Sequence, residues 1–172
     1  YIGNKILIYG KKQSHFPFQC MVGPDWFCML ITYCLIIVPS ILFIIYVADV
    51  ISFILTIISS ISLAILLGFY SYAACSDPGI IYKDAYIIDP EENISNAKVG
   101  MIECSQCQMM RPCTAMHCYD CGVCVEELDH HCPWTGKCIG KKTLQAFYGF
   151  LFVLVVHLLF VGGVGLYFIS FH

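Results

Sequence analysis

The fold is decided by residues 26–74, WFCMLITYCLIIVPSILFIIYVADVISFILTIISSISLAILLGFYSYAA. Asp49 carries the only ionisable side chain of this stretch other than those of Cys and Tyr. The stretch has roughly 49 residues, more than twice the ~20 that cross a bilayer once. We therefore expect two transmembrane helices, near residues 26–47 and 51–73, with Asp49 at the turn between them, where its carboxylate avoids the hydrocarbon.

The composition of the whole chain is also that of a membrane protein. Of the 172 residues, 59% are hydrophobic and 12% are charged, whereas soluble domains carry about 25% charged residues. Residues 146–171 form a third apolar run without any charge, which is long enough for a third span. The chain starts at Tyr1 and stops at His172 beside this run, so we expect both ends to be cuts in a longer protein and a fourth helix to be missing.

The positive charges predict the orientation of these spans. All nine basic residues lie before the first span or between the second and the third, and the turn between the first two spans has none. Because cytosolic loops are enriched in Lys and Arg, the N-terminal segment and residues 76–142 are expected to be cytosolic. The basic residues are Lys5, Lys11, Lys12, Lys83, Lys98, Arg111, Lys137, Lys141 and Lys142.

Eight of the twelve cysteines lie between Cys104 and Cys138, interleaved with histidines. Cysteines in a reducing compartment bind metal or do chemistry rather than form disulfides. The ordered pattern is Cys104-x2-Cys107-x9-His117-Cys118-x2-Cys121-x2-Cys124-x4-Asp129-His130-His131-Cys132-x5-Cys138. A Cys-x2-Cys step lets two thiolates bind one tetrahedral zinc, and a structural zinc takes four ligands.

Six cysteines and two histidines therefore fill two zinc sites and leave one cysteine and one histidine over. Spacing alone does not pair the ligands, because Cys121 could act with Cys118 or with Cys124, and either His130 or His131 could bind metal. A surplus cysteine beside histidine and aspartate has the makings of an activated nucleophile. A zinc-ribbon scaffold without catalysis explains the same pattern equally well.

One motif makes the pattern specific. The sequence resembles the DHHC protein S-acyltransferases, also called palmitoyltransferases. A weaker similarity to the Ras-modifying branch and its plant relatives is carried by Gly3-Asn4-Lys5 and Gly23-Pro24-Asp25. The residues that carry the main resemblance are Asp129-His130-His131-Cys132, the following Pro133-Trp134 and Cys138-Ile139-Gly140, and Asp77-Pro78-Gly79 after the second span.

The resemblance implies a ligand set and a set of roles. It assigns Cys132 as the nucleophile, His130 as its base and Asp129 as the group that orients His130. One structural zinc would be held by Cys104, Cys107, His117 and Cys124, and a second by Cys118, Cys121, His131 and Cys138. The implied reaction transfers a long acyl chain from palmitoyl-CoA through acyl-Cys132 to cysteines of substrate proteins near the membrane. An accessory subunit is compatible with the family, and no nucleic-acid partner is expected.

The sequence departs from the family pattern in several places. Thr143 stands where Asn is usual, Thr114 where a basic residue is usual, and Thr135 and Lys137 also differ. These departures, together with the absent fourth span, motivate an alternative function, a catalytically weak zinc-bearing membrane adaptor.

Two further side chains are candidates for contact with the acyl donor. Trp134 is expected at the membrane border, where an indole serves equally well as an interfacial anchor. His157 lies about ten residues into the third span, ~15 Å deep. We expect it to face the bundle interior and to hydrogen-bond to a neighbouring helix, because a polar group facing lipid is costly. Beyond this packing role, it could line the acyl cavity and limit chain length.

The expected architecture is an all-α multi-pass membrane bundle of three spans with a small cytosolic zinc-binding domain of short β-ribbons and loops. We expect it in the endomembrane system, in the Golgi or ER, with the plasma membrane as an alternative. The expected parts are a cytosolic N-terminal segment (1–25), two transmembrane helices (26–74), a cytosolic loop with Asp77-Pro78-Gly79 (75–103), the zinc domain (104–145) and a third transmembrane helix (146–171).

Overall fold

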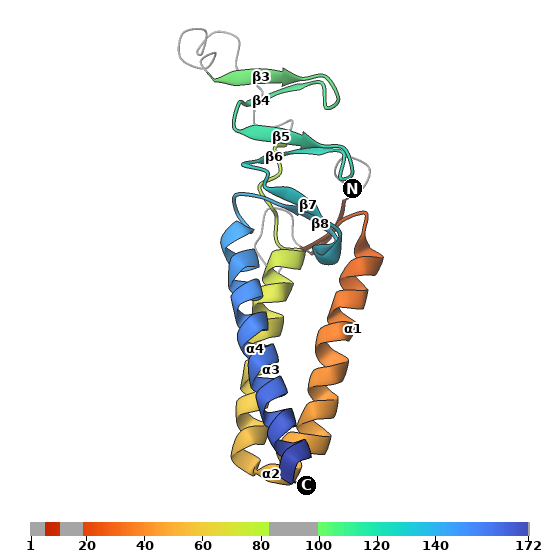
Figure 1. Cartoon of the computed structure of the whole chain (residues 1–172). Helices are drawn as coiled ribbons and strands as arrows, with labels where there is room; N and C mark the ends of the chain where they lie inside the picture. Colours follow the sequence, from red (N-terminus) through yellow and green to blue (C-terminus); the bar gives the residue numbers. More distant parts are fainter. Residues whose placement is uncertain (1–5, 11–18, 83–99, 172) are drawn as a thin grey trace.

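The computed structural model describes residues 6–10, 19–82 and 100–171. Long helices lie side by side, and a stack of short β-ribbons extends beyond one end of them (Figure 1). Five of the nine basic residues and the motif Gly3-Asn4-Lys5 lie outside the described residues. The five are Lys5, Lys11, Lys12, Lys83 and Lys98.

Three helical segments of the described chain are long and apolar enough to cross a membrane, namely Trp26–Ile51, Phe53–Cys75 and Leu144–Phe171. Apolar side chains such as Ile, Leu, Val and Phe occupy nearly every turn of them, and most of these side chains are exposed within the structure. The helical elements are α1 (Trp26–Phe43), the π-helical η1 (Ile44–Ala48), α2 (Asp49–Ile51), α3 (Phe53–Cys75) and α4 (Leu144–Phe171).

The chain reverses between α2 and α3 at Ser52. The backbone of Ser52 is extended, and its Oγ accepts a hydrogen bond from the backbone N–H of Ile54, which caps the start of α3. The reversal therefore comes three residues after Asp49, where the turn was expected, because the serine supplies the cap that begins the next helix. Asp49 is exposed at this end of the bundle.

The rest of the described chain forms four separate antiparallel ribbons of two strands each. An isolated two-stranded hairpin is at best marginally stable in water, so these ribbons need another source of stability. The strands are β1 (Leu7–Gly10) with β2 (Gln19–Val22), β3 (Met101–Cys104) with β4 (Met109–Pro112), β5 (Ala115–Cys118) with β6 (Val123–Glu126), and β7 (His130–Cys132) with β8 (Lys137–Ile139). A single 3₁₀ turn, η3 (Pro133–Thr135), connects β7 to β8.

The N-terminal ribbon takes part in the small core of the ribbon stack. Ile6 and Met21 are buried in one cluster with Ile80, Val125 and three cysteines, namely Cys118, Cys121 and Cys138. From the sequence we expect only a cytosolic segment there. The burial of Ile6 and Met21 depends on contact with Ile80 and Val125, which lie 59 to 119 positions later in the chain.

The Asp77-Pro78-Gly79 motif connects the end of α3 to the ribbons. Asp77 Oδ1 accepts hydrogen bonds from the backbone N–H groups of Gly79 and Ile80, at 2.9 and 2.8 Å. Gly79 has φ +111°, which favours glycine, and its carbonyl accepts the backbone N–H of Glu126 at 2.9 Å. The motif therefore forms a tight turn that holds β6 over the helices.

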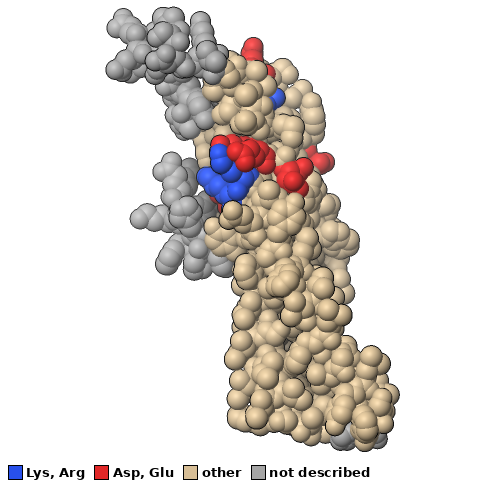
Figure 2. All heavy atoms as spheres, turned by 60° about the vertical axis from the view of Figure 1, so that its left-hand side comes forward, with Lys and Arg blue, Asp and Glu red and all other residues tan. Residues whose placement is uncertain are grey.

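Charged side chains gather where the ribbons meet the helices, and the helical face below them in Figure 2 presents none. The ion pairs there join Lys142 to Asp77 at 2.9 Å, and Lys141 to Glu126 and Glu127 at 2.6 and 3.1 Å. Lysine and carboxylate groups of this kind belong in water or at a membrane surface rather than in hydrocarbon.

Candidate metal centres and active site

Two groups of four Cys and His side chains lie within the ribbon stack. In each group the candidate ligand atoms all lie within 4.8 Å of one another. One group is Cys104, Cys107, His117 and Cys124, and the other is Cys118, Cys121, His131 and Cys138. These are the two sets that the family resemblance implies.

The ribbons position each group in the same way. Cys104 and Cys107 stand at the turn of the β3–β4 ribbon, and His117 and Cys124 face each other across the β5–β6 ribbon. Each group therefore joins the end of one ribbon to the middle of the next, as the stack in Figure 1 allows.

The second group repeats this arrangement one ribbon further along. Cys118 and Cys121 stand at the turn of β5–β6, while His131 and Cys138 are cross-strand partners in β7–β8. Cys121 therefore lies with Cys118 rather than with Cys124, which spacing had left open.

The donor atoms fit zinc. With Zn–S bonds of about 2.3 Å and Zn–N bonds of about 2.0 Å, a tetrahedron needs sulfur–sulfur edges of about 3.8 Å and sulfur–nitrogen edges of about 3.5 Å. The Sγ atoms of Cys107 and Cys124 are 3.7 Å apart. The distances from His131 Nδ1 to the Sγ atoms of Cys118, Cys121 and Cys138 are 3.5, 3.4 and 3.8 Å. Occupancy by zinc stays a prediction.

The strand β7 separates the roles of the two neighbouring histidines. Side chains alternate along a strand, so His130 and Cys132 share one side of β7 while His131 is on the other. The His130 ring packs edge-on against Phe147 of α4, with ring centres 5.3 Å apart. Its Nδ1 donates to Asp129 Oδ2 at 2.7 Å, which leaves the lone pair on Nε2 available as a proton acceptor.

Cys132 is 6% exposed and belongs to neither ligand group. It lines an apolar cavity of about 400 Å³ between the helices, a volume within the ~300–1,000 Å³ of small-molecule sites. Trp134 lies at the same cavity, and the lining continues along the helices through Ile36, Phe147, Phe150, Leu151 and Leu154.

The loop after Cys132 is held by hydroxyl groups from two helices. The carbonyl of Trp134 accepts hydrogen bonds from Thr32 Oγ1 of α1 at 3.1 Å and from Tyr70 OH of α3 at 2.8 Å. The Tyr70 hydroxyl also lies 3.0 Å from the carbonyl of Met29. No sequence motif includes Thr32 or Tyr70, and a single hydroxyl within an apolar run gives no sign of a function.

Lys137 is fully buried beneath this loop. Its Nζ donates to the carbonyls of Ala73, at 3.2 Å, and Ala74, which are unpaired acceptors at the C-terminal end of α3. Burial, which disfavours the charged ammonium, lowers the pKa of Lys137 to about 8. The lysine that departs from the family pattern therefore caps a helix.

His157 is buried and bonded to both neighbouring helices, as expected. Its Nε2 lies 3.0 Å from Ser40 Oγ of α1 and its Nδ1 lies 2.9 Å from Ser62 Oγ of α3. Because the Ser40 hydroxyl donates to the carbonyl of Ile36, it accepts from Nε2–H, and Nδ1 accepts from Ser62. His157 does not itself line the cavity beside Cys132.

The comparisons with known proteins agree with this site. Residues 100–172 match the DHHC palmitoyltransferase family. The human palmitoyltransferase ZDHHC5 is 35% identical over 126 residues, which cover 67% of this chain and 18% of that protein. A putative ZDHHC-type palmitoyltransferase 1 of Dictyostelium discoideum is 32% identical over 157 residues, which cover 83% of this chain and 36% of that protein. The chain thus spans only a minor part of these curated relatives, and it belongs to the DHHC palmitoyltransferase family.

Proposed function

We propose that this chain is the catalytic part of a protein-cysteine S-palmitoyltransferase. The observation that carries the proposal is the position of Cys132, which stands outside both ligand groups and lines an apolar cavity between the helices. A cysteine needed only for a zinc scaffold would have no reason to face such a cavity. The family match and the names of the relatives support the same activity.

In the first step, the Cys132 thiolate attacks the carbonyl carbon of an acyl-CoA thioester. His130 Nε2 takes the thiol proton, and Asp129 keeps the proton of the same ring on Nδ1. The bond from carbonyl carbon to the CoA sulfur breaks, and the CoA thiolate takes up the proton. In the second step, a cysteine thiol of a substrate protein gives its proton to His130 Nε2 and attacks the carbonyl carbon of acyl-Cys132. The bond from this carbon to Cys132 Sγ breaks, the acyl group stays on the substrate cysteine, and the Cys132 thiolate takes the proton back from His130.

The two zinc ions are structural in this proposal, since each closed group of four ligands leaves no open position for substrate. Their binding fixes the β7–β8 ribbon, and therefore Cys132, over the helices. The three helices would cross a membrane of the Golgi, the ER or the plasma membrane. The cytosolic side would carry the ribbons. This orientation accords with the position of Arg111 in β4, with Lys141 and Lys142 beside the ribbons, and with Asp49 as the charged residue at the opposite end of the first two spans.

The acyl chain would occupy the apolar cavity, with Trp134 beside the thioester. The cavity lining reaches Ile36 on α1 and Leu154 on α4. Ser40 and His157 follow one helical turn further along the same two helices. We place the polar group of Ser40, Ser62 and His157 at the closed end of the acyl site, where it would oppose longer chains.

The departures from the family pattern do not remove any of the proposed machinery. Thr143 is fully buried, and its hydroxyl lies 3.3 Å from the backbone N of Gly140, for which it is the acceptor. It therefore supports the turn into α4 rather than facing the cavity. The adaptor alternative has no observation of its own beyond these departures.

The test is labelling of the purified full-length protein with labelled palmitoyl-CoA. We expect hydroxylamine-sensitive label on the wild type, none on Cys132→Ser, and full label on Cys113→Ser, because Cys113 is exposed and belongs to neither ligand group. A wild type that binds two zinc ions but takes no label would instead establish the adaptor. Equal label on Cys132→Ser would reject Cys132 as the nucleophile.

A further inference from the structure

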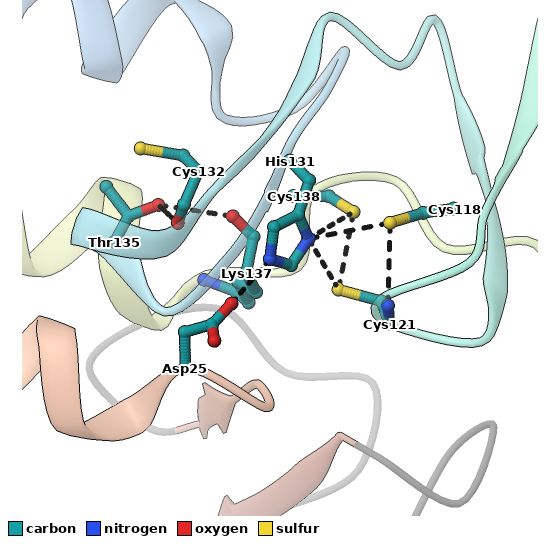
Figure 3. Close-up of polar contacts among 8 residues, drawn as sticks. All are labelled: Asp25, Cys118, Cys121, His131, Cys132, Thr135, Lys137 and Cys138. Carbon is teal, nitrogen blue, oxygen red and sulfur yellow. Dashed lines mark hydrogen bonds and ion pairs between the residues drawn. The ribbon is translucent and has the colours of Figure 1, made fainter.

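A carboxylate at the start of α1 contacts the second ligand group. Asp25 Oδ2 lies 2.6 Å from His131 Nε2, while Nδ1 of the same ring faces the three sulfur atoms of Cys118, Cys121 and Cys138 (Figure 3). The two nitrogens of one ring are therefore divided between a metal group and an acid that lies 106 residues earlier in the chain.

Capping of α1 does not account for the orientation of the Asp25 side chain. Asp25 is the N-cap residue of α1, the usual place for an aspartate, yet its side chain makes no capping hydrogen bond. The carboxylate turns instead to the histidine, although a capping bond would satisfy an N–H of its own helix. The side chain thus serves the ligand group rather than the helix.

The backbone around Asp25 is built for this close approach. The backbone N of Asp25 lies 3.3 Å from the carbonyl O of Gly136. A Cβ atom at Gly23 would lie 2.2 Å from that oxygen and 2.5 Å from Lys137 Cβ. Only glycine at position 23 lets the segment before α1 lie directly against the loop that follows Cys132.

We propose that Asp25 is a positioning residue for the second zinc site. Its carboxylate accepts the Nε2–H of His131, holds the proton on that nitrogen and so presents the Nδ1 lone pair to the metal. Metal-binding histidines commonly donate their other N–H to a carboxylate, and loss of such a partner costs about 10–100-fold in metal affinity. The first transmembrane helix would thereby help to hold the zinc that supports the reactive loop.

This inference rests on the zinc binding proposed above but not on the acyl transfer. It predicts an effect confined to one of two metal ions, because Asp25 contacts the second group through His131 and is not a member of either group. A general loss of folding would affect both ions.

The experiment measures zinc transfer from the purified full-length protein to a chromogenic chelator. We expect Asp25→Ala to release one of its two zinc ions roughly 10–100-fold faster than the wild type, with the other unchanged. Asp25→Asn should be intermediate, since an amide oxygen still accepts the hydrogen bond but lacks the charge. Asp129→Ala is the matched control, because it removes the carboxylate that bonds to His130, the neighbour of His131. This variant should release both zinc ions at the wild-type rate.

A second variant tests the contact between Asp25 and His131 while it keeps the carboxylate. Gly23→Ala should displace the segment that carries Asp25 and accelerate release of the same single ion. Wild-type release from Asp25→Ala, or equal acceleration of both ions in that variant, would overturn the inference. Acyl labelling of the wild type tests the proposed function separately, since a protein that takes no label can still show the selective zinc effect.

Discussion

His130 and His131 are neighbours in the sequence, yet the structure gives them different surroundings. The side chain of His131 is 14% exposed among sulfur atoms, whereas that of His130 is 39% exposed beside Asp129 and Phe147. The alternation of side chains along β7 produces this difference, because two successive residues of a strand point to opposite sides.

Substitution of each histidine should therefore affect a different property. His130→Ala should keep both zinc ions and slow acylation of Cys132 by about 10²–10⁴-fold, the usual contribution of a general base. His131→Ala should lose one zinc ion. Metal analysis and the rate of labelling by acyl-CoA check both variants. Loss of zinc from His130→Ala with retention in His131→Ala would reverse the roles.

Substitution of Lys137 should strongly reduce the stability of the protein. Lys137→Met removes the donor to the last carbonyls of α3 and should cost about 1–3 kcal/mol for each acceptor left unpaired in the interior. Lys137→Gln should cost less, because the amide still donates. The control is Lys142→Met, which removes an exposed ion pair with Asp77 worth about 0–1 kcal/mol. Thermal unfolding in detergent measures all three, and equal losses at the two lysines would contradict the capping role.

Hydrogen bonds between side chains connect the helices at the buried His157. His157 joins α4 to α1 and α3 through Ser40 and Ser62, and interhelical hydrogen bonds of this kind are worth about 0.6 kcal/mol each on average. Loss of both should therefore reduce stability by about 1 kcal/mol.

Two substitutions separate this packing role from the proposed limit on the length of the acyl chain. The His157→Leu and His157→Ala proteins should both be less stable than the wild type, but only His157→Ala also opens space at the end of the cavity. We expect His157→Ala to accept longer acyl chains when donors of graded length are compared. Ser170→Ala is the control, since Ser170 on the same helix is exposed and donates a hydrogen bond to the carbonyl of Leu166, one turn earlier in its own helix. An unchanged preference in His157→Ala would leave the packing role alone.

At the scale of the whole molecule, the ribbons and the helices have different sources of stability. The ribbons share no sheet, and their core cluster has only eight buried residues within the described chain. We therefore expect metal binding to supply much of the folding free energy of the stack.

Removal of zinc should accordingly unfold one part of the molecule and not the other. After treatment with a strong chelator, we expect proteases to cleave within residues 100–140, while the helical circular dichroism in detergent stays almost unchanged. Mass spectrometry of the fragments locates the cuts. Resistance of this region after complete loss of zinc would show that the ribbons are stable without metal.

The sequence by itself determined the features that depend on local composition and spacing. The long apolar runs predicted three helices because a span needs about 20 apolar residues wherever it lies. The Cys-x2-Cys steps predicted two metal groups because two thiolates at this spacing can bind one tetrahedral zinc ion. With the family motif, these features predict Cys132 as the nucleophile.

Only the tertiary structure decided the contacts between distant segments. The grouping of Cys121 with Cys118, the contact of Asp25 with His131 and the burial of Lys137 against α3 each depend on how ribbons and helices pack. The Cys-x2-Cys steps allowed two pairings for Cys121. No local pattern marks the contacts of Asp25 and Lys137, since an aspartate before a helix is typical of a cap and a lysine beside a membrane of a surface charge. The surroundings of Lys137 and Asp25 arise when segments 64 and 106 residues apart come into contact, and that contact sets which hydrogen bonds each side chain makes.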